Sequence, residues 1–229
     1  MKTLLFLSAS ILILFPGRLL SAPVAINDAY PVEKGFSLGV SYAIEARDTP
    51  FFFGHNLKVN QSVYSIILNY TIPAGMNYSA SIYEYAAEAA DREATQPGIG
   101  ASVAASSHIH GDGILSLVWN WHLALKGGRT EFDRYKGSVS DITHSYLISQ
   151  ASLTATSFAG VFSFSAGISF MNAIDEYREN TSSITVKKSG SSFIPLSGIS
   201  VRFTDNVIIT LSGYYGGIDG AEAACRIAF

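Results

Sequence analysis

Strict alternation of apolar with small or polar residues is the feature that most constrains this chain. In residues 35–46, an apolar residue stands at every even position from Phe36 to Ile44, and a small or polar residue stands at every odd position. Because successive side chains of a β-strand point to opposite faces, a period of two indicates a strand with one apolar face. The same pattern recurs in residues 61–71, 114–126 and 161–171.

Weaker examples of this pattern bring the expected number of strands to about ten. They are residues 76–86, 98–107, 142–155, 192–203, 207–215 and the terminal stretch 220–229. The pair within 76–107 is the least secure, because its YEYAAEAADREA segment also has good helix propensity. If that pair is not two strands, eight strands remain.

The expected connections alternate between short and long. Short, turn-like segments are predicted at 72–75, 110–113, 156–159 and 204–206, and the last connection, near 216–220, is also short. Longer polar segments are predicted at 47–60, 87–97, 127–141 and 172–191. Alternation of tight turns with longer loops is typical of transmembrane β-barrels, whereas a soluble β-sandwich has no need of it.

The bulk composition demands that much apolar surface be buried or shielded, because 48% of the 229 residues are hydrophobic and 14% are charged. The single long apolar run lies in residues 1–22, where Lys2 precedes an apolar core of about a dozen residues. This run is shorter than the ~20 residues of a spanning helix and predicts a cleaved secretory signal peptide. Cleavage would change the formal charge from −3 to −5, which argues against a nucleic-acid partner.

Without a spanning helix, the remaining way to cross a bilayer is a closed barrel, since every backbone polar group must find a partner within the protein. We therefore predict one all-β domain, residues 23–229, folded as a closed antiparallel up-and-down transmembrane β-barrel. The apolar rows would face lipid and the small polar rows the lumen. Aromatic residues near the strand ends would form interfacial girdles; these are Phe36, Tyr64, Tyr70, Phe170, Phe203, Tyr215 and Phe229.

The last ten residues, GAEAACRIAF, alternate in the same way and end on Phe229. A leader followed by alternating strands and a terminal aromatic residue resembles the bacterial outer-membrane β-barrel proteins, although no motif singles out one family. This resemblance implies localisation in the outer membrane of a Gram-negative bacterium. It also implies recognition of Phe229 by the barrel-assembly machinery and contact with outer-membrane lipids.

Strand parity places several ionisable side chains on the lumen face: Glu45, His122, His144, Tyr146, Arg202, Glu222 and Arg226. Glu45 and Glu222 are expected near the outer mouth, with Arg202 and Arg226 deeper. In a small barrel, such groups often pair across the interior as a polar plug. The functional alternative is a narrow pore with acidic outer residues and basic inner ones. Cys225, the only cysteine, shares the parity of Ile227 and is expected to face lipid.

Enzymatic and metal-binding interpretations are weaker. His108, His110 and Asp112 have the spacing of a metal clip, but the intervening glycines favour a hairpin turn. Asp141 and His144 opposite Glu45 and Glu222 would resemble the omptin proteases, yet the chain is shorter than these enzymes and has none of their motifs. There is no P-loop and no zinc-finger spacing. We expect no enzyme activity, no metal and no cofactor.

The sequence thus predicts an integral outer-membrane protein that acts as a small porin-like channel or as a surface structural protein. Two alternatives remain open: an adhesin or binding barrel that uses its loops, above all 172–191, and an omptin-like or lipid-processing enzyme at the rim. A small solute or a surface ligand is the possible partner.

Overall fold

The computed structural model describes residues 35–50, 56–72, 75–89, 92–110, 118–132, 142–179, 185–216 and 218–229. The predicted signal peptide, residues 1–22, lies outside these ranges. Among the described residues, no helix is long or apolar enough to cross a membrane.

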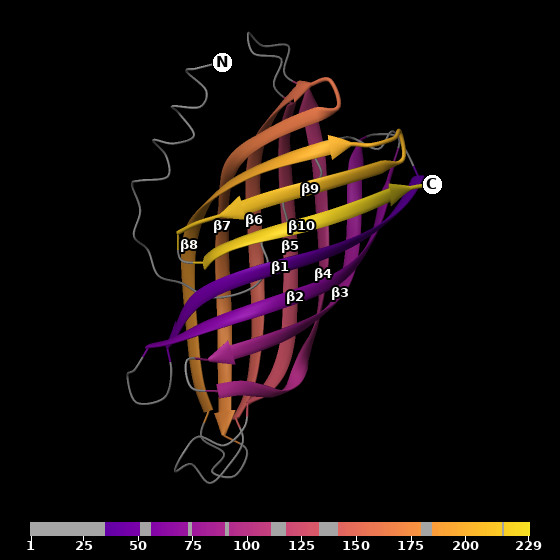
Figure 1. The fold of residues 1–229 in the computed structure, drawn as a ribbon. Helices are drawn as coiled ribbons and strands as arrows, with labels where there is room; N and C mark the ends of the chain where they lie inside the picture. Colours follow the sequence, from indigo (N-terminus) through magenta and orange to yellow (C-terminus); the bar gives the residue numbers. More distant parts are fainter. Residues whose placement is uncertain are drawn as a thin grey trace.

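Ten antiparallel strands form a closed barrel in which each strand pairs with its neighbours in sequence and β1 pairs with β10 (Figure 1). The strands are β1 (Gly35–Pro50), β2 (Asn56–Thr71), β3 (Met76–Ala89), β4 (Arg92–His110), β5 (Val118–Phe132), β6 (Ile142–Ala159), β7 (Phe162–Glu179), β8 (Thr185–Arg202), β9 (Val207–Tyr214) and β10 (Ile218–Ala228). The predicted up-and-down barrel is confirmed. Ten strands are correct, since residues 76–89 form β3 and residues 92–107 belong to β4.

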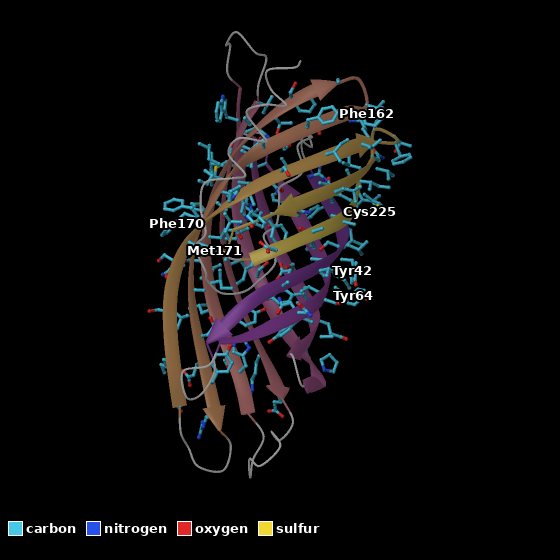
Figure 2. All side chains as sticks on the ribbon, turned by 60° about the vertical axis from the view of Figure 1, so that its left-hand side comes forward. Tyr42, Tyr64, Phe162, Phe170, Met171 and Cys225 are labelled. Carbon is cyan, nitrogen blue, oxygen red and sulfur yellow. The ribbon has the colours of Figure 1, made fainter. Side chains whose placement is uncertain are left out.

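Side chains face the way the alternation predicts. On β1, Phe36, Leu38 and Val40 are exposed on the outer surface, whereas Ser37 and Ser41 are buried in the interior. Two aromatic pairs lie on this outer surface: Phe36 packs on Tyr70, and Tyr42 packs on Tyr64 further along β1, with ring centroids 4.6 and 4.7 Å apart. Figure 2 shows Tyr42 and Tyr64 side by side on the outside of the wall.

Adjacent residues on β7 show the same division between outside and inside. Phe170 points outward and contacts Phe193 of β8, whereas its neighbour Met171 is buried in the interior (Figure 2). From Phe162 to Phe170 the outer row runs roughly 26 Å along the strand at about 3.3 Å per residue. This length is comparable with the apolar band of about 25 Å typical of outer-membrane barrels.

Short turns join the strands at one end of the barrel, here called the turn end. Gly75 and Gly160 adopt positive φ angles of 78° and 65°, which only glycine adopts without strain. The turn predicted at 156–159 lies instead at 160–161, because β6 continues to Ala159. The predicted turn at 204–206 is present, and that at 110–113 lies mostly outside the described residues.

At the opposite end, here called the loop end, the predicted long loops are wrong in extent. Residues 172–179 and 185–191, expected to be loop, belong to β7 and β8, and parts of 47–60, 87–97 and 127–141 are likewise strand. The alternation of apolar residues fades there because the strands continue beyond the apolar band, where polar side chains such as Asn172 and Ser191 face outward. The hydrogen-bonded ladder continues without the hydrophobic pattern.

One strand edge is not covered by another described strand. β9 pairs with β8 only along residues 196–202, whereas β7 pairs with β8 from Thr185 onward. The β8–β9 ladder ends at Pro195, whose carbonyl accepts a hydrogen bond from the Tyr215 amide (3.4 Å). Proline has no N–H to offer a further strand, so it blocks extension of the ladder. The wall therefore extends less far towards the loop end at the β9–β10 hairpin than at β7 and β8 (Figure 1).

Candidate functional site in the barrel interior

Four buried tyrosines fill part of the interior towards the loop end. This tyrosine cluster consists of Tyr83 and Tyr85 of β3, Tyr146 of β6 and Tyr177 of β7, none more than 6% exposed. Tyr85 meets Tyr146 edge to face at 5.7 Å, and His144 lies between Tyr146 and Tyr177. Side chains, rather than an open lumen, therefore occupy this level of the barrel.

Glycines in the wall make room for these rings. Tyr83 pairs in register with Gly100, Tyr85 with Gly98, Tyr146 with Gly128, and Tyr214 with Gly220 of β10. At each of these glycines, an added Cβ would lie less than 3.0 Å from the tyrosine ring. A large ring thus lies flat over a residue without a side chain on the adjacent strand, which packs the interior and shields the glycine backbone.

Hydrogen bonds tie the cluster across the barrel. The Tyr146 hydroxyl donates to the Tyr83 hydroxyl at 2.8 Å, and Tyr83 donates to the carbonyl of Gly127 at 3.0 Å. These bonds connect β6, β3 and β5, and the Tyr83 hydroxyl acts as both donor and acceptor. Hydrogen bonds satisfied in this way offset the cost of burying the phenol oxygens.

A buried carboxylate joins the strands on either side of the barrel closure. Glu45 of β1 is 1% exposed and accepts hydrogen bonds from Gln61 of β2 (2.8 Å) and Tyr214 of β9 (2.5 Å). The prediction that Glu45 lies on the lumen side agrees with this position. Its expected place near the outer mouth is wrong, because β1 continues for five residues to Pro50 and the side chain points into the packed interior.

His144 is paired rather than free to act on a substrate. Its Nε2 lies 2.6 Å from Oδ1 of Asp175 on β7, and its ring stacks on Tyr177 at 4.5 Å with an interplanar angle of 12°. Both partners of the pair are at most 1% exposed. Asp141, expected beside His144, lies outside the described residues.

A polar chamber lies on the turn-end side of the tyrosine cluster, against the wall formed by β10 and β1 to β5. Its cavity volume is about 80 Å³, and its lining includes Lys126 and His122 from β5, facing Glu222 and Arg226 from β10. Because β5 and β10 lie on opposite sides of the ring of strands, polar and charged side chains from two opposite walls face the same chamber. Serine side chains from β1 to β4 complete the wall.

The predicted residues therefore do not form one site. Glu45 lies with Gln61 and Tyr214, His144 lies with Asp175, and His122, Glu222 and Arg226 line the chamber. Arg202 is half-buried near the turn end, where its amide donates to Val161. His108 contacts Asn120 at the same end. Within the described ranges, no group of three His, Cys, Asp or Glu side chains is placed to hold a metal ion.

Several interior residues could have been found by extending the strand parity. Lys126 has the same parity as His122 on one strand, and Asp175 has that of Met171 on a segment that reads as a loop. The tyrosine cluster carries a sequence signal as well, because inward tyrosines pair with inward glycines in register. Recognising those pairs requires the register between strands, which the sequence alone does not supply.

Solved structures show what this fold resembles. The translocator domain of the autotransporter NalP from Neisseria meningitidis matches with a TM-score of 0.56 and 9% identity, covering all of this chain and 94% of that one. The β domain of the Bordetella autotransporter BrkA matches with a TM-score of 0.53 and 9% identity over 86% of this chain and 100% of that one. The fold is therefore that of bacterial outer-membrane β-barrels.

The omptin resemblance gains little from these comparisons. The outer membrane protease OmpT from Escherichia coli matches with a TM-score of 0.43 and 7% identity over 85% of this chain and 95% of that one, which is too remote to carry an argument about activity. No protein-family model and no curated protein sequence matches the chain significantly.

Proposed function

We propose that this chain is a non-enzymatic integral protein of the bacterial outer membrane, exported through a cleaved signal peptide of residues 1–22. Its role would be that of a closed structural barrel exposed at the cell surface rather than an open porin. The observation that carries this proposal is the filled interior: the tyrosine cluster and the Glu45 group occupy the lumen towards the loop end and are almost wholly buried.

Insertion into the membrane follows from the outer surface. Leucine, isoleucine, valine and aromatic side chains cover the wall between the girdles, where lipid is the matching solvent. The main-chain amide of Phe229 donates to the carbonyl of Phe36 at 2.9 Å, while its side chain remains 79% exposed. An exposed terminal aromatic residue is available to the barrel-assembly machinery, which we propose as the partner during biogenesis.

Conductance in planar lipid bilayers tests the closed state. We expect no discrete openings from the purified, folded protein, and openings from a Tyr83→Ala/Tyr146→Ala variant that removes two rings of the cluster. Each sample should first be compared, boiled and unboiled, on a gel, since a folded barrel migrates differently from the unfolded chain. Regular openings of the unchanged protein would overturn the closed structural role and support a channel.

A second role is the binding of a partner at the cell surface. It is favoured by the length of β6, β7 and β8, which extend beyond the apolar band towards the loop end. From Phe193 to Thr185, β8 continues for roughly 26 Å at about 3.3 Å per residue towards the loop end. Its outward side chains there include Ser189 and Lys187, which are exposed. Replacing Arg178 and Lys187 by serine should reduce adhesion of expressing cells while barrel folding is unchanged. Undiminished adhesion would argue against binding at the outer face of β7 and β8 near the loop end.

A further inference from the structure

The polar chamber on the turn-end side of the tyrosine cluster has the features of a ligand site. A water molecule needs about 10–15 Å³ of such volume, so a cavity of about 80 Å³ holds several waters or one small solute. Small hydroxyl side chains line one wall and the methyl groups of Ala104, Ala124 and Ala224 line others. A solute of a few heavy atoms, with one polar end and one apolar end, fits this lining.

Lys126 supplies a charge that the protein leaves uncompensated at short range. Its side chain is 5% exposed, and within the described structure its ammonium forms no ion pair and no hydrogen bond. Glu222 and Glu45 attract it from a distance. The carboxylate of Glu45, however, is held by Gln61 and Tyr214. Since a buried charge is costly without close partners, Lys126 calls for acceptor oxygens in the chamber.

His122 adds a second polar group without a partner. It is 5% exposed and lines the chamber four residues before Lys126, on the same inward face of β5. Among the residues that the structure describes, neither of its ring nitrogens has a hydrogen-bond partner. An imidazole N–H and an ammonium group in the lining of one chamber can both donate to one carboxylate, and such charge-assisted hydrogen bonds are strong.

The charge of the lining selects the ligand. Lys126 and Arg226 are positive and Glu222 is negative, so the lining itself carries a net charge of +1 with His122 neutral, and Glu45 adds a negative charge from outside the lining. A monoanion supplies the close partner that Lys126 lacks among the described residues, whereas Glu222 and Glu45 would repel a second negative charge. We propose that the chamber binds a small monocarboxylate with a short alkyl group. Its oxygens accept hydrogen bonds from Lys126 and His122, and its alkyl group contacts the alanines. Entry is from the turn end, because the tyrosine cluster covers the other end.

Calorimetric titration of the folded protein in detergent micelles with acetate tests the site. Acetamide, which has the same shape and no charge, is the matched control, and sodium chloride keeps the ionic strength constant. We expect saturable binding of acetate and none of acetamide. Lys126→Met should weaken acetate binding at least tenfold, whereas Lys187→Met on the outer surface should leave it unchanged.

Two further variants keep the test decisive if Lys126→Met does not fold. Lys126→Arg preserves the charge and should retain acetate binding, while Ala224→Leu fills the chamber without changing its charge and should abolish binding. The inference is overturned if the unchanged protein shows no saturable binding of acetate. It is also overturned if acetamide binds equally well, or if Ala224→Leu binds acetate normally. None of these outcomes depends on whether the barrel conducts ions.

Discussion

The hydroxyl of Tyr146 on β6 donates a 2.8 Å hydrogen bond to the hydroxyl of Tyr83 on β3, two residues that are 63 positions apart in the chain. β4 and β5 separate these strands in the wall, so the hydrogen bond crosses the interior instead of running along the wall. The barrel is therefore held by two systems: the hydrogen-bonded ladder around the wall and a side-chain network through the middle. The interior network is what distinguishes a closed barrel from a channel.

The hydroxyl of Tyr83 should contribute measurably to stability. Tyr83→Phe keeps the ring over Gly100 but removes the bonds to Tyr146 and Gly127, so we expect a loss of about 1–3 kcal/mol in the free energy of unfolding. Urea unfolding in micelles, followed by the mobility of unboiled samples, measures it. Tyr64→Phe, on the lipid-facing surface, is the control and should change stability little. Equal effects of the two substitutions would contradict the network.

Replacing glycine beneath a ring should also destabilise the barrel. In Gly100→Ala the new methyl group would collide with the ring of Tyr83, and such overpacking costs about 1–3 kcal/mol. Gly213→Ala, where the nearest atom would be 3.8 Å away, is the control and should be nearly neutral. Adding Gly100→Ala to a Tyr83→Ala variant should cost much less than adding it to the unchanged protein. If Gly100→Ala lowers the free energy of unfolding equally in both backgrounds, the strain does not come from a collision with Tyr83.

Glu45 and Tyr214 should be energetically coupled across the closure of the barrel. Their 2.5 Å hydrogen bond involves a buried carboxylate, and bonds to charged groups contribute about 1.5–3 kcal/mol. A double-mutant cycle with Glu45→Gln and Tyr214→Phe should therefore give a coupling energy of about 0.5–3 kcal/mol in urea unfolding. Additive effects would show that the two groups do not act as a pair.

Hydrogen exchange should alternate along the free part of β8. The carbonyl of Pro195 faces β9 and the amide of Arg202 faces β7, so amides at odd positions point to the uncovered edge. We predict fast exchange at Ser189, Ser191 and Phe193 and slow exchange at Ser192 and Ile194. Uniform protection along residues 189–194 would mean that another segment covers this edge.

Strand periodicity accounts for much of the fold in advance, because the lipid-facing rows must be apolar wherever the wall meets hydrocarbon. It correctly orients Phe36, Tyr64 and Phe170 outward and Glu45 inward. It fails towards the loop end, where residues 172–191 are mostly strand. There the bilayer no longer imposes an apolar face, so strand pairing continues where the alternation of apolar residues has stopped.

The candidate site was less accessible to prediction for a different reason. Parity places His122 and Glu222 in the lumen, but it does not tell which inward residues of opposite walls meet. That depends on register and tilt around ten strands, and His144 accordingly pairs with Asp175 of β7, a partner that strand parity alone does not indicate. The tyrosine–glycine pairs depend on the same register, which the ladder fixes only in three dimensions.

The central claim, that the apolar rows face acyl chains, can be tested without any substitution. The protein has two tryptophans, Trp119 and Trp121, both on the outward row of β5. Their intrinsic fluorescence should be strongly quenched in bilayers of lipids brominated on the acyl chains and weakly quenched by aqueous acrylamide. Efficient acrylamide quenching, with no effect of brominated lipid, would contradict the account.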